Sequence, residues 1–256
     1  MAARRMFVLP TGTCYLADFR TKLGGSNEEV GVPLPMFAID TDDGWVVFDT
    51  GCDPEAATDP EATWGRLAKA FRLEMSDADH PLARLAEAGI AVADVAHVVV
   101  SHLHMDHAGG IRFFPDATVH LQVAERRWAQ FPDRFGAPGF ISKDFDRPEI
   151  TYRYHEGDAR IVPGVHAVLT DGHTPGHQSL VVDLPSGRFV LTGDAAYRRD
   201  QIDRRLPPPT TTDEFAAIRS LARLKGFEDR DGATILVAHD SEQWATTIKS
   251  PDGYYE

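Results

Sequence analysis

The sequence has few cysteines, no long basic run and an excess of acidic residues. Its 256 residues include only two cysteines, Cys14 and Cys52. Two thiols are too few for a disulfide framework or a thiolate zinc site, so we expect both to be reduced, in a cytoplasmic protein. The 39 acidic residues outnumber the 26 Lys and Arg, which give a formal net charge of -13. A chain of this charge lacks the basic surface that binds a phosphate backbone, so no nucleic-acid partner is expected.

Long apolar runs are absent as well. Arg4 and Arg5 precede the apolar stretch 6–9, but Pro10 ends it. A signal-peptide core needs roughly 7 to 15 apolar residues and a membrane span about 20, so the stretch fits neither and no membrane association is expected. With 43% hydrophobic residues, the chain is rich enough to bury a core, and its length fits one large α/β or α+β domain or two small ones. No linker in the sequence marks a second domain, so residues 1–256 are predicted to form a single domain.

Hydrophobic periodicity predicts alternating strands and helices. Strands are expected at residues 6–9, 36–40, 45–48, 95–101, 118–123, 160–162, 165–169, 179–183, 189–192 and 234–238. Two helices are expected within 63–88, and others at 124–130 and 212–224. Residues 22–35 are predicted to form a long exposed loop, a candidate for a homodimer contact or for the rim of a pocket. Residues 131–148 form another predicted loop, whose phenylalanines, Phe140 among them, either anchor it to the core or wall a substrate pocket.

A dense group of metal-binding side chains follows the strand predicted at 95–101. It contains His102, His104, Asp106 and His107 within six residues. Imidazole and carboxylate ligands without a nearby thiolate indicate an open, catalytic site for a divalent transition metal. Alternate residues of an extended backbone point the same way, so His102 and His104 can reach one metal. Asp106 and His107 can then serve a second metal beside it.

Two metals need more ligands than this cluster holds. Further candidate donors stand at the ends of later predicted strands. They are His177, Asp194 and His239, with Asp194 as a carboxylate able to bridge the pair. His173 is the alternative to His177 as the metal ligand from this segment. We prefer His177 because the turn at Pro175-Gly176 precedes it and would aim its side chain.

The order of these donors resembles the signature of the metallo-β-lactamase superfamily. The resemblance implies that residues 1–256 form one α+β hydrolase domain, a four-layer αββα sandwich with a dinuclear site at one edge. The turn Asp49-Thr50-Gly51 resembles the early Asp-x-Gly turn of that superfamily, in which the Asp supports the site from behind.

A narrower resemblance is to the N-acyl-homoserine lactone lactonases, the quorum-quenching branch. It spans nearly the whole chain and is carried by residues 101–110, 174–180, 194–197 and 239–243. It implies that His102, His104 and His177 bind one metal, that Asp106, His107 and His239 bind the other, and that Asp194 bridges them. The active-site tyrosine of the family maps to Tyr197. Met105 stands where some members have phenylalanine, so we expect it to shape the substrate pocket. Phe140, from the predicted loop at 131–148, is the other residue expected in that pocket.

The resemblance therefore implies a metal-dependent hydrolase that opens the lactone ring of N-acyl-homoserine lactones in quorum quenching. A hydroxide bridging two divalent ions would attack the carbonyl, Tyr197 would donate a hydrogen bond to the oxyanion, and Asp106 would carry a proton to the leaving alkoxide. Zinc is favoured, with iron, cobalt or manganese as alternatives.

Other activities of the same superfamily remain open at this point. They are a thioesterase, another lactonase or a phosphotriesterase-like enzyme, because the metal ligands do not separate these substrates. Against a thioesterase resembling glyoxalase II, only residues 240–256 follow His239, too few for its helical substrate domain. The redox branch is disfavoured because it carries Glu where this chain has His104. A metal-binding scaffold with a dead site is the alternative from another class.

Overall fold

Two β-sheets form the centre of the molecule. The computed structural model describes residues 3–133 and 139–256. Within them, one sheet has the strand order β4-β1-β2-β3-β5-β6-β7 and the other β12-β11-β10-β9-β8. The strands are β1 (Ala3–Ala17), β2 (Glu29–Thr41), β3 (Gly44–Phe48), β4 (Arg72–Glu74), β5 (Val95–Val99), β6 (Thr118–Gln122), β7 (Thr151–His155), β8 (Ala159–Val162), β9 (Val165–Leu169), β10 (Gln178–Leu184), β11 (Gly187–Leu191) and β12 (Thr234–Leu236).

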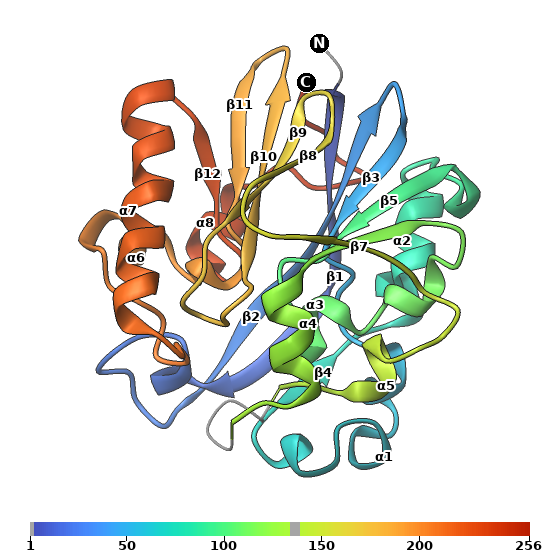
Figure 1. Ribbon diagram of the computed structural model, residues 1–256. Helices are drawn as coiled ribbons and strands as arrows, with labels where there is room; N and C mark the ends of the chain where they lie inside the picture. Colours follow the sequence, from blue (N-terminus) through green and yellow to red (C-terminus); the bar gives the residue numbers. More distant parts are fainter. Residues whose placement is uncertain (1–2, 134–138) are drawn as a thin grey trace.

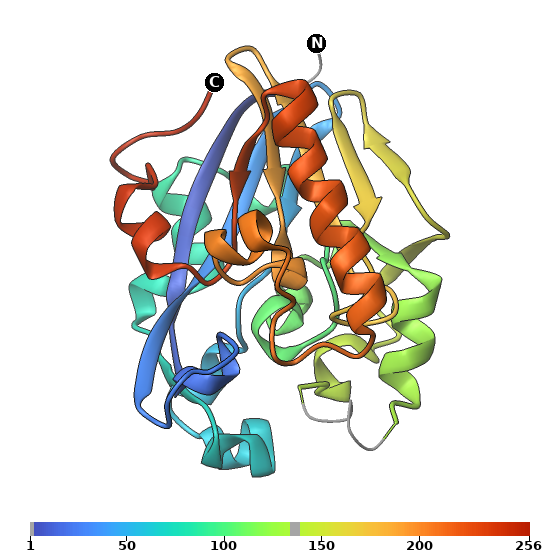
Figure 2. The same cartoon turned by 90° about the vertical axis from the view of Figure 1, so that its left-hand side faces the viewer.

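Eight helices lie around the two sheets in the part of the chain that the structure describes. They are α1 (Pro60–Trp64), α2 (Pro81–Glu87), α3 (Met105–Ala108), α4 (Val123–Gln130), α5 (Ser142–Phe145), α6 (Arg199–Arg204), α7 (Glu214–Asp231) and α8 (Ser241–Thr246). Figure 1 shows α6 and α7 outside the sheet that contains β10–β12, and α2–α5 on the side of the other sheet. The turned view in Figure 2 shows α7 lying along that smaller sheet. The predicted four-layer αββα sandwich is confirmed.

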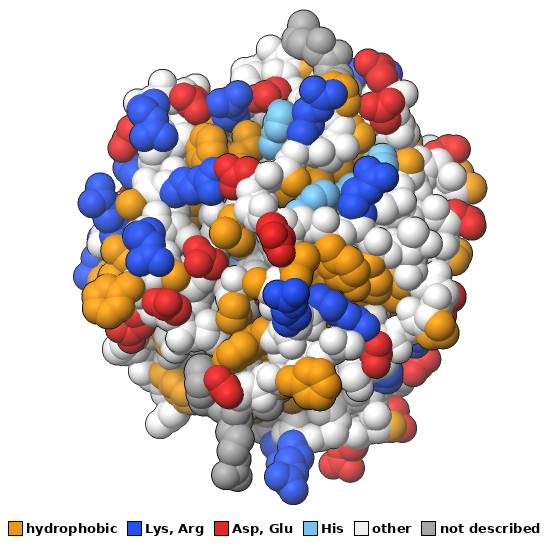
Figure 3. Space-filling model, viewed as in Figure 1, with side chains coloured by type: hydrophobic (Ala, Val, Ile, Leu, Met, Phe, Trp, Pro, Cys, Tyr) orange, Lys and Arg blue, Asp and Glu red, His pale blue; other side chains and the backbone are white. Residues whose placement is uncertain are grey.

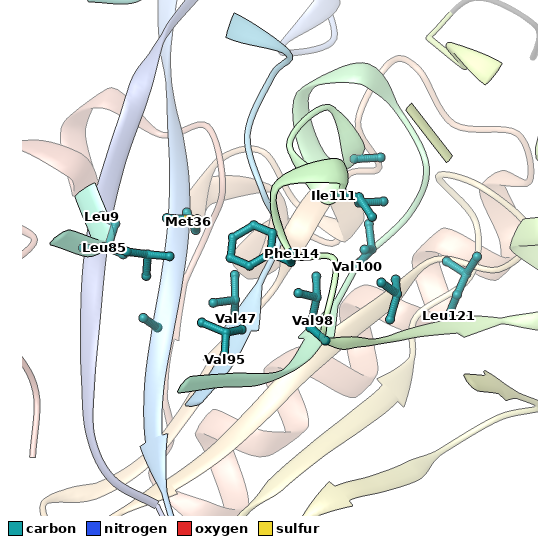
Figure 4. Close-up of a cluster of buried hydrophobic side chains, with 14 of the residues drawn as sticks. Leu9, Met36, Val47, Leu85, Val95, Val98, Val100, Ile111, Phe114 and Leu121 are labelled. Carbon is teal, nitrogen blue, oxygen red and sulfur yellow. The ribbon is translucent and has the colours of Figure 1, made fainter. Parts of the chain in front are cut away.

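The central strands bury side chains on both of their faces. In β1, Met6 and Val8 face the space between the sheets, whereas Phe7 and Leu9 face the helices outside. In β10, Leu180 likewise packs between the sheets. Successive side chains of a strand point to opposite faces, so a strand covered on both faces is apolar throughout. The outer cluster of the larger sheet is drawn in Figure 4.

Parallel strand pairs bring several loops to one edge of the sandwich. β3 pairs in parallel with β5, β5 with β6, and β11 with β12. Parallel neighbours end at the same edge of a sheet, so the segments that follow β3, β5, β11 and β12 meet there. These segments carry most of the predicted site: Asp49, residues 102–107, Asp194 and His239.

Several predicted boundaries differ from the structure. The loop expected at 22–35 is wrong for residues 29–35, because β1 and β2 pair from Ala3↔Thr41 to Ala17↔Glu29. The first helix expected within 63–88 is replaced by the short α1, a 3-10 turn at Gly65–Lys69 and strand β4. Helix α7 continues past Gly226 to Asp231, because Gly232, in the left-handed region at φ 65°, provides its C-terminal cap.

The surface carries charges of both signs. On the face shown in Figure 3, Lys and Arg side chains lie among Asp and Glu side chains. Many are paired, for example Arg188 with Asp183 at 2.7 Å and Arg126 with Asp146 at 2.6 Å. In the part of the chain that the structure describes, no helix is long and apolar enough to cross a membrane.

Candidate active site

The first donors lie on an extended segment that turns into a short helix. Strand β5 ends at Val99, the chain continues through Ser101 and His102, and α3 begins at Met105. His104 precedes the helix with extended backbone angles, φ -70° and ψ 157°. His102 and His104 therefore project from extended chain, while Asp106 and His107 project from the first turn of α3.

Three imidazoles and one carboxylate form a first donor group. His102 Nε2 lies 2.9 Å from His104 Nδ1, and His173 Nε2 lies 3.2 and 3.1 Å from these two atoms. Asp194 Oδ2 lies 3.4 Å from His173 Nε2 and 3.7 Å from His102 Nε2. Burial lowers the pKa of His104 to about 4 and that of His102 well below its usual range. Neutral imidazoles offer the lone pairs that a metal requires.

A second donor group shares Asp194 with the first. Asp194 Oδ1 lies 3.0 Å from His107 Nε2 and 3.0 Å from His239 Nε2. Asp106 Oδ2 lies 3.5 Å from His107 Nε2 and 3.6 Å from His239 Nε2. The two oxygens of Asp194 thus face different groups, as a bridging carboxylate requires.

The donor set fits divalent metal ions. Ligand nitrogens about 2.0–2.1 Å from a tetrahedral zinc ion lie roughly 3.3 Å apart, close to the imidazole spacing found here. His107 Nε2 and Asp194 Oδ1 are buried and lie 3.0 Å apart, but neither forms a hydrogen bond of regular geometry. Buried polar atoms are normally paired, so these two atoms indicate a place where a cation binds. No cysteine belongs to either group, in keeping with an open rather than a closed structural site.

The structure contradicts the choice of His177 over His173. His173 belongs to the first donor group, whereas both nitrogens of His177 are engaged elsewhere. The amide N–H of Asp194 donates to His177 Nε2 at 2.9 Å, and His177 Nδ1 lies 3.1 Å from the carbonyl oxygen of Thr170. His177 therefore positions the backbone of Asp194 instead of facing the donor groups.

The sequence held no local signal that separates the two histidines, because a glycine precedes each of them. The turn at Gly176 does not aim His177 at the site. A Cβ at Gly176 would lie 2.1 Å from the backbone nitrogen of Glu125, so this turn is pressed against α4. The backbone of His177, just before β10, pairs with the residue after β9: the His177 carbonyl accepts the Thr170 N–H at 2.9 Å.

Asp49 lies behind the donor groups. Its Oδ2 is 2.8 Å from His107 Nδ1, and its Oδ1 accepts the Ser101 N–H at 2.6 Å. The Ser101 hydroxyl, which donates to Asp49 Oδ2, also lies 3.0 Å from His102 Nδ1. Asp49 adopts φ 56°, a left-handed conformation that costs a non-glycine residue energy and is maintained by this network. Such contacts orient the rings whose other nitrogens face the metal.

Glu125 joins two segments of the site and was not expected from the sequence. It is fully buried on α4, where its Oε1 accepts the Leu103 N–H at 3.0 Å and its Oε2 accepts the Gly176 N–H at 3.2 Å. Leu103 stands between two donor histidines, and Gly176 belongs to the turn after His173. One carboxylate therefore ties both donor segments together, and no motif around a helical glutamate signals this role.

A cavity of about 580 Å³ opens over the donor groups. His104, His173, Asp194 and His239 line it, and its apolar wall comes from Leu16, Val32, Leu67, Phe71 and Met105. Phe140, the other residue predicted for the pocket, does not belong to its lining. Its ring instead packs on His104, with 4.6 Å between centroids, and its backbone forms a β-bridge with that residue. Phe135 of the same predicted loop lies outside the described residues.

Tyr197 stands beside both donor groups at the cavity floor. Its ring centroid lies 5.1 Å from that of His239 and 5.9 Å from that of His173. Burial, and then the neighbouring Asp194 carboxylate, raises the pKa of the Tyr197 phenol well above its usual range. The hydroxyl therefore keeps its proton and can act as a hydrogen-bond donor.

This arrangement of donors agrees with a comparison against known families. The family model of the metallo-beta-lactamase superfamily matches residues 33–239. The chain belongs to this superfamily. The matched range begins in β2 and ends at the last donor, His239, so it includes every residue of the two donor groups.

Relatives of known name are similar over nearly their whole length. The N-acyl homoserine lactonase AttM of Azorhizobium caulinodans is 35% identical over 260 residues, which cover 98% of each chain. The N-acyl homoserine lactonase of Bacillus cereus is 30% identical, over 95% of this chain and 96% of its own. The chain therefore belongs to the N-acyl homoserine lactonase family within the superfamily.

Solved structures show the same fold. A structure of an N-acyl homoserine lactone hydrolase with the product N-hexanoyl-L-homoserine bound at its catalytic metal center has a TM-score of 0.90 and 26% identity. The match covers 99% of this chain and 100% of that one.

Proposed function

We propose that this protein is an N-acyl-homoserine lactonase, a quorum-quenching hydrolase that opens the lactone ring of acylated homoserine lactones. The observation that carries the proposal is the cavity floor, where two donor groups share Asp194 and the Tyr197 ring lies beside a histidine of each group. Opening a lactone requires a hydrogen-bond donor or Lewis acid at its carbonyl oxygen and a proton for its leaving alkoxide. The apolar wall above the floor suits the acyl chain.

The donor groups suit two divalent ions, for which zinc is our first choice and iron, cobalt or manganese the alternatives. When bound, such ions supply Lewis-acid polarisation of the ester carbonyl and acidify water. Asp194 contributes the negative charge that lets two cations lie side by side. Elemental analysis of protein purified without chelator should approach two equivalents per chain, and a fully active preparation with one equivalent would contradict the two-ion site.

The residues of the chain itself divide the remaining tasks. The Tyr197 hydroxyl donates a hydrogen bond to the carbonyl oxygen as it becomes an oxyanion. Burial would raise the pKa of Asp106, but the His107 imidazole lowers it to about 2, so the carboxylate is ionised and able to accept a proton. We propose that Asp106 takes a proton from the attacking water and delivers it to the ring oxygen.

Steady-state assays on a matched set of substrates test the proposal. N-hexanoyl-homoserine lactone should be opened with a higher kcat/KM than a hexanoyl thioester or a phosphotriester, and Asp194→Asn serves as the control with a damaged site. A thioester or phosphotriester preferred over every lactone would overturn the proposed substrate. A protein that holds metal but turns over none of these esters would be a scaffold.

Replacing Tyr197 by Phe tests its role. The change removes one hydroxyl and leaves the ring and all donors in place, so the metal content should not change. We expect kcat to fall roughly 10²-fold, the usual scale for an oxyanion donor. An unchanged kcat with a raised KM would make Tyr197 a residue that only positions the substrate.

Two further properties stay proposals. We propose a cytoplasmic location, supported by the two buried free thiols, whose pKa burial raises. Cell fractionation tests it. We also propose that the exposed part of the predicted loop, residues 22–28 with Leu23 63% exposed, serves a homodimer contact, which analytical ultracentrifugation of the wild type and Leu23→Ser tests.

A further inference from the structure

The hydroxyl of Tyr197 has one close partner outside the donor groups. It lies 2.5 Å from the Oγ1 atom of Thr210. Thr210 belongs to the segment between α6 and α7 and lines the cavity. Nothing in the sequence separates it from its neighbours Thr211 and Thr212.

Other contacts already fix the position of the Tyr197 ring. The Tyr197 N–H donates to Gln201 Oε1 at 2.8 Å, and the Tyr197 carbonyl accepts the His239 N–H at 3.0 Å. The ring is 7% exposed and packs between His173 and His239. Thr210 is therefore not needed to place the ring, and its contact concerns the direction of the hydroxyl proton.

Each of the two hydroxyls has a single proton, so the pair has two arrangements. If Tyr197 donates to Thr210, its proton points away from the donor groups. If Thr210 donates to Tyr197, the phenolic proton is free to point toward Asp194 and the cavity floor. In this second arrangement the phenolic proton lies on the side of the donor groups, where Asp194 is within hydrogen-bond reach of the hydroxyl.

We propose that Thr210 is a positioning residue, which donates its hydroxyl proton to Tyr197 and thereby directs the phenolic proton at the substrate carbonyl. A hydroxyl that accepts one hydrogen bond becomes a stronger donor of the next, so the Thr210–Tyr197 chain strengthens the bond to the oxyanion. The inference rests on the proposed lactonase activity, because it acts only through Tyr197.

The backbone around Thr210 is well placed for this role. Pro207, Pro208 and Pro209 precede it and restrict the backbone of the segment that leads to it. Immediately after it, the Thr211 hydroxyl donates to the Pro208 carbonyl at 2.7 Å, and the Thr212 N–H donates to the Gly172 carbonyl at 2.8 Å. The segment is thus pinned beside His173, and the Thr210 hydroxyl is presented at a fixed place.

Two substitutions separate the effect of the Thr210 hydroxyl from the effect of its bulk. Thr210→Val keeps the shape and loses the donor, so kcat should fall roughly 3- to 10-fold while KM changes little. Thr210→Ser keeps the donor and should stay within about twofold of the wild type. The reverse order, with Val active and Ser impaired, would mean that Thr210 acts by its bulk and would overturn the proposal.

A double-mutant cycle tests whether the effect passes through Tyr197. In the Tyr197→Phe background, Thr210→Val should cause no further loss of kcat, because the group it directs is gone. Thr211→Val removes a hydroxyl from the same turn and provides the matched control, whose effect should be the same with or without the Tyr197 hydroxyl. A Thr210→Val loss of equal size in both backgrounds would overturn the proposal.

A measurement without substrate distinguishes this inference from the proposed function. In protein labelled with ¹³Cζ-tyrosine, Thr210→Val should shift the Tyr197 resonance, which Tyr197→Phe assigns, and Thr210→Ser should leave it near its wild-type position. That pattern in a protein that opens no lactone supports the hydroxyl pairing and overturns only the proposed function. An unmoved resonance in Thr210→Val overturns the pairing, even if lactones are hydrolysed.

Discussion

The two histidines of the turn after β9 should respond to substitution in opposite ways. His173 Nε2 lies 3.1–3.4 Å from His104 Nδ1, His102 Nε2 and Asp194 Oδ2. His173→Ala therefore removes one of four donors from the first group. We expect the metal content to fall from two equivalents toward one, and kcat/KM to fall more than the 10- to 100-fold typical of residues that only support a ligand.

His177→Ala should instead cost stability. It removes the acceptor of the buried Asp194 N–H, which lies 2.9 Å from His177 Nε2. An unsatisfied buried donor costs about 1–3 kcal/mol, and the space left by a fully buried ring adds to that loss. Two metals should stay bound, with affinities lowered about 10- to 100-fold because Asp194 is less well held.

Two measurements on the same preparations distinguish these outcomes. Elemental analysis after gel filtration gives the metal content, and urea denaturation of the metal-free proteins gives the free energy of unfolding. We expect His173→Ala to lose metal and His177→Ala to lose stability. Two equivalents in His173→Ala together with one in His177→Ala would refute the assignment of the first donor group.

Two other predictions concern buried carboxylates outside the donor groups. Glu125→Gln can accept only one of the two N–H bonds from Leu103 and Gly176, so the free energy of unfolding should fall by about 1–3 kcal/mol, measured by urea denaturation. Chelator competition should show weaker metal binding. An unchanged free energy of unfolding together with an unchanged metal affinity would contradict the role of Glu125 in joining the two donor segments. Burial, and then the neighbouring Asp53, raises the pKa of Asp144 from 3.8 to about 7. The protonated form of Asp144 stabilises the fold at pH values below the pKa that this group has in the unfolded chain. This stability is lost as the pH rises through the pKa that the group has in the folded protein. The wild type should therefore lose about 2 kcal/mol more than Asp144→Asn between about pH 5 and about pH 7, and parallel denaturation profiles would refute this.

The sequence by itself determined the fold class and most of the donors. The strands at 165–169 and 118–122 are visible because β-branched and apolar residues repeat with the period of a buried strand. Donors such as His102, His104, Asp106 and His107 are visible because they stand together in six residues, a density that is local information.

Only the tertiary structure decided which later histidine joins them. His173 and His177 each follow a glycine, and the difference between them arises from the contact of Gly176 with α4 and from the Asp194 N–H that occupies His177 Nε2. Both contacts join segments far apart in the chain, so no local pattern encodes them. The same holds for Phe140, which packs behind His104 instead of lining the cavity.

The roles of the supporting residues could not be predicted from the sequence for the same reason. Glu125 and Thr210 lie in an ordinary helix and an ordinary loop, and their roles come from bonds to Leu103, Gly176 and Tyr197. A side chain that binds a metal directly needs a particular chemical type, which the sequence displays. A side chain that orients another one needs only a hydrogen-bonding atom at the right place, and that place exists only once the two sheets and their loops have packed together.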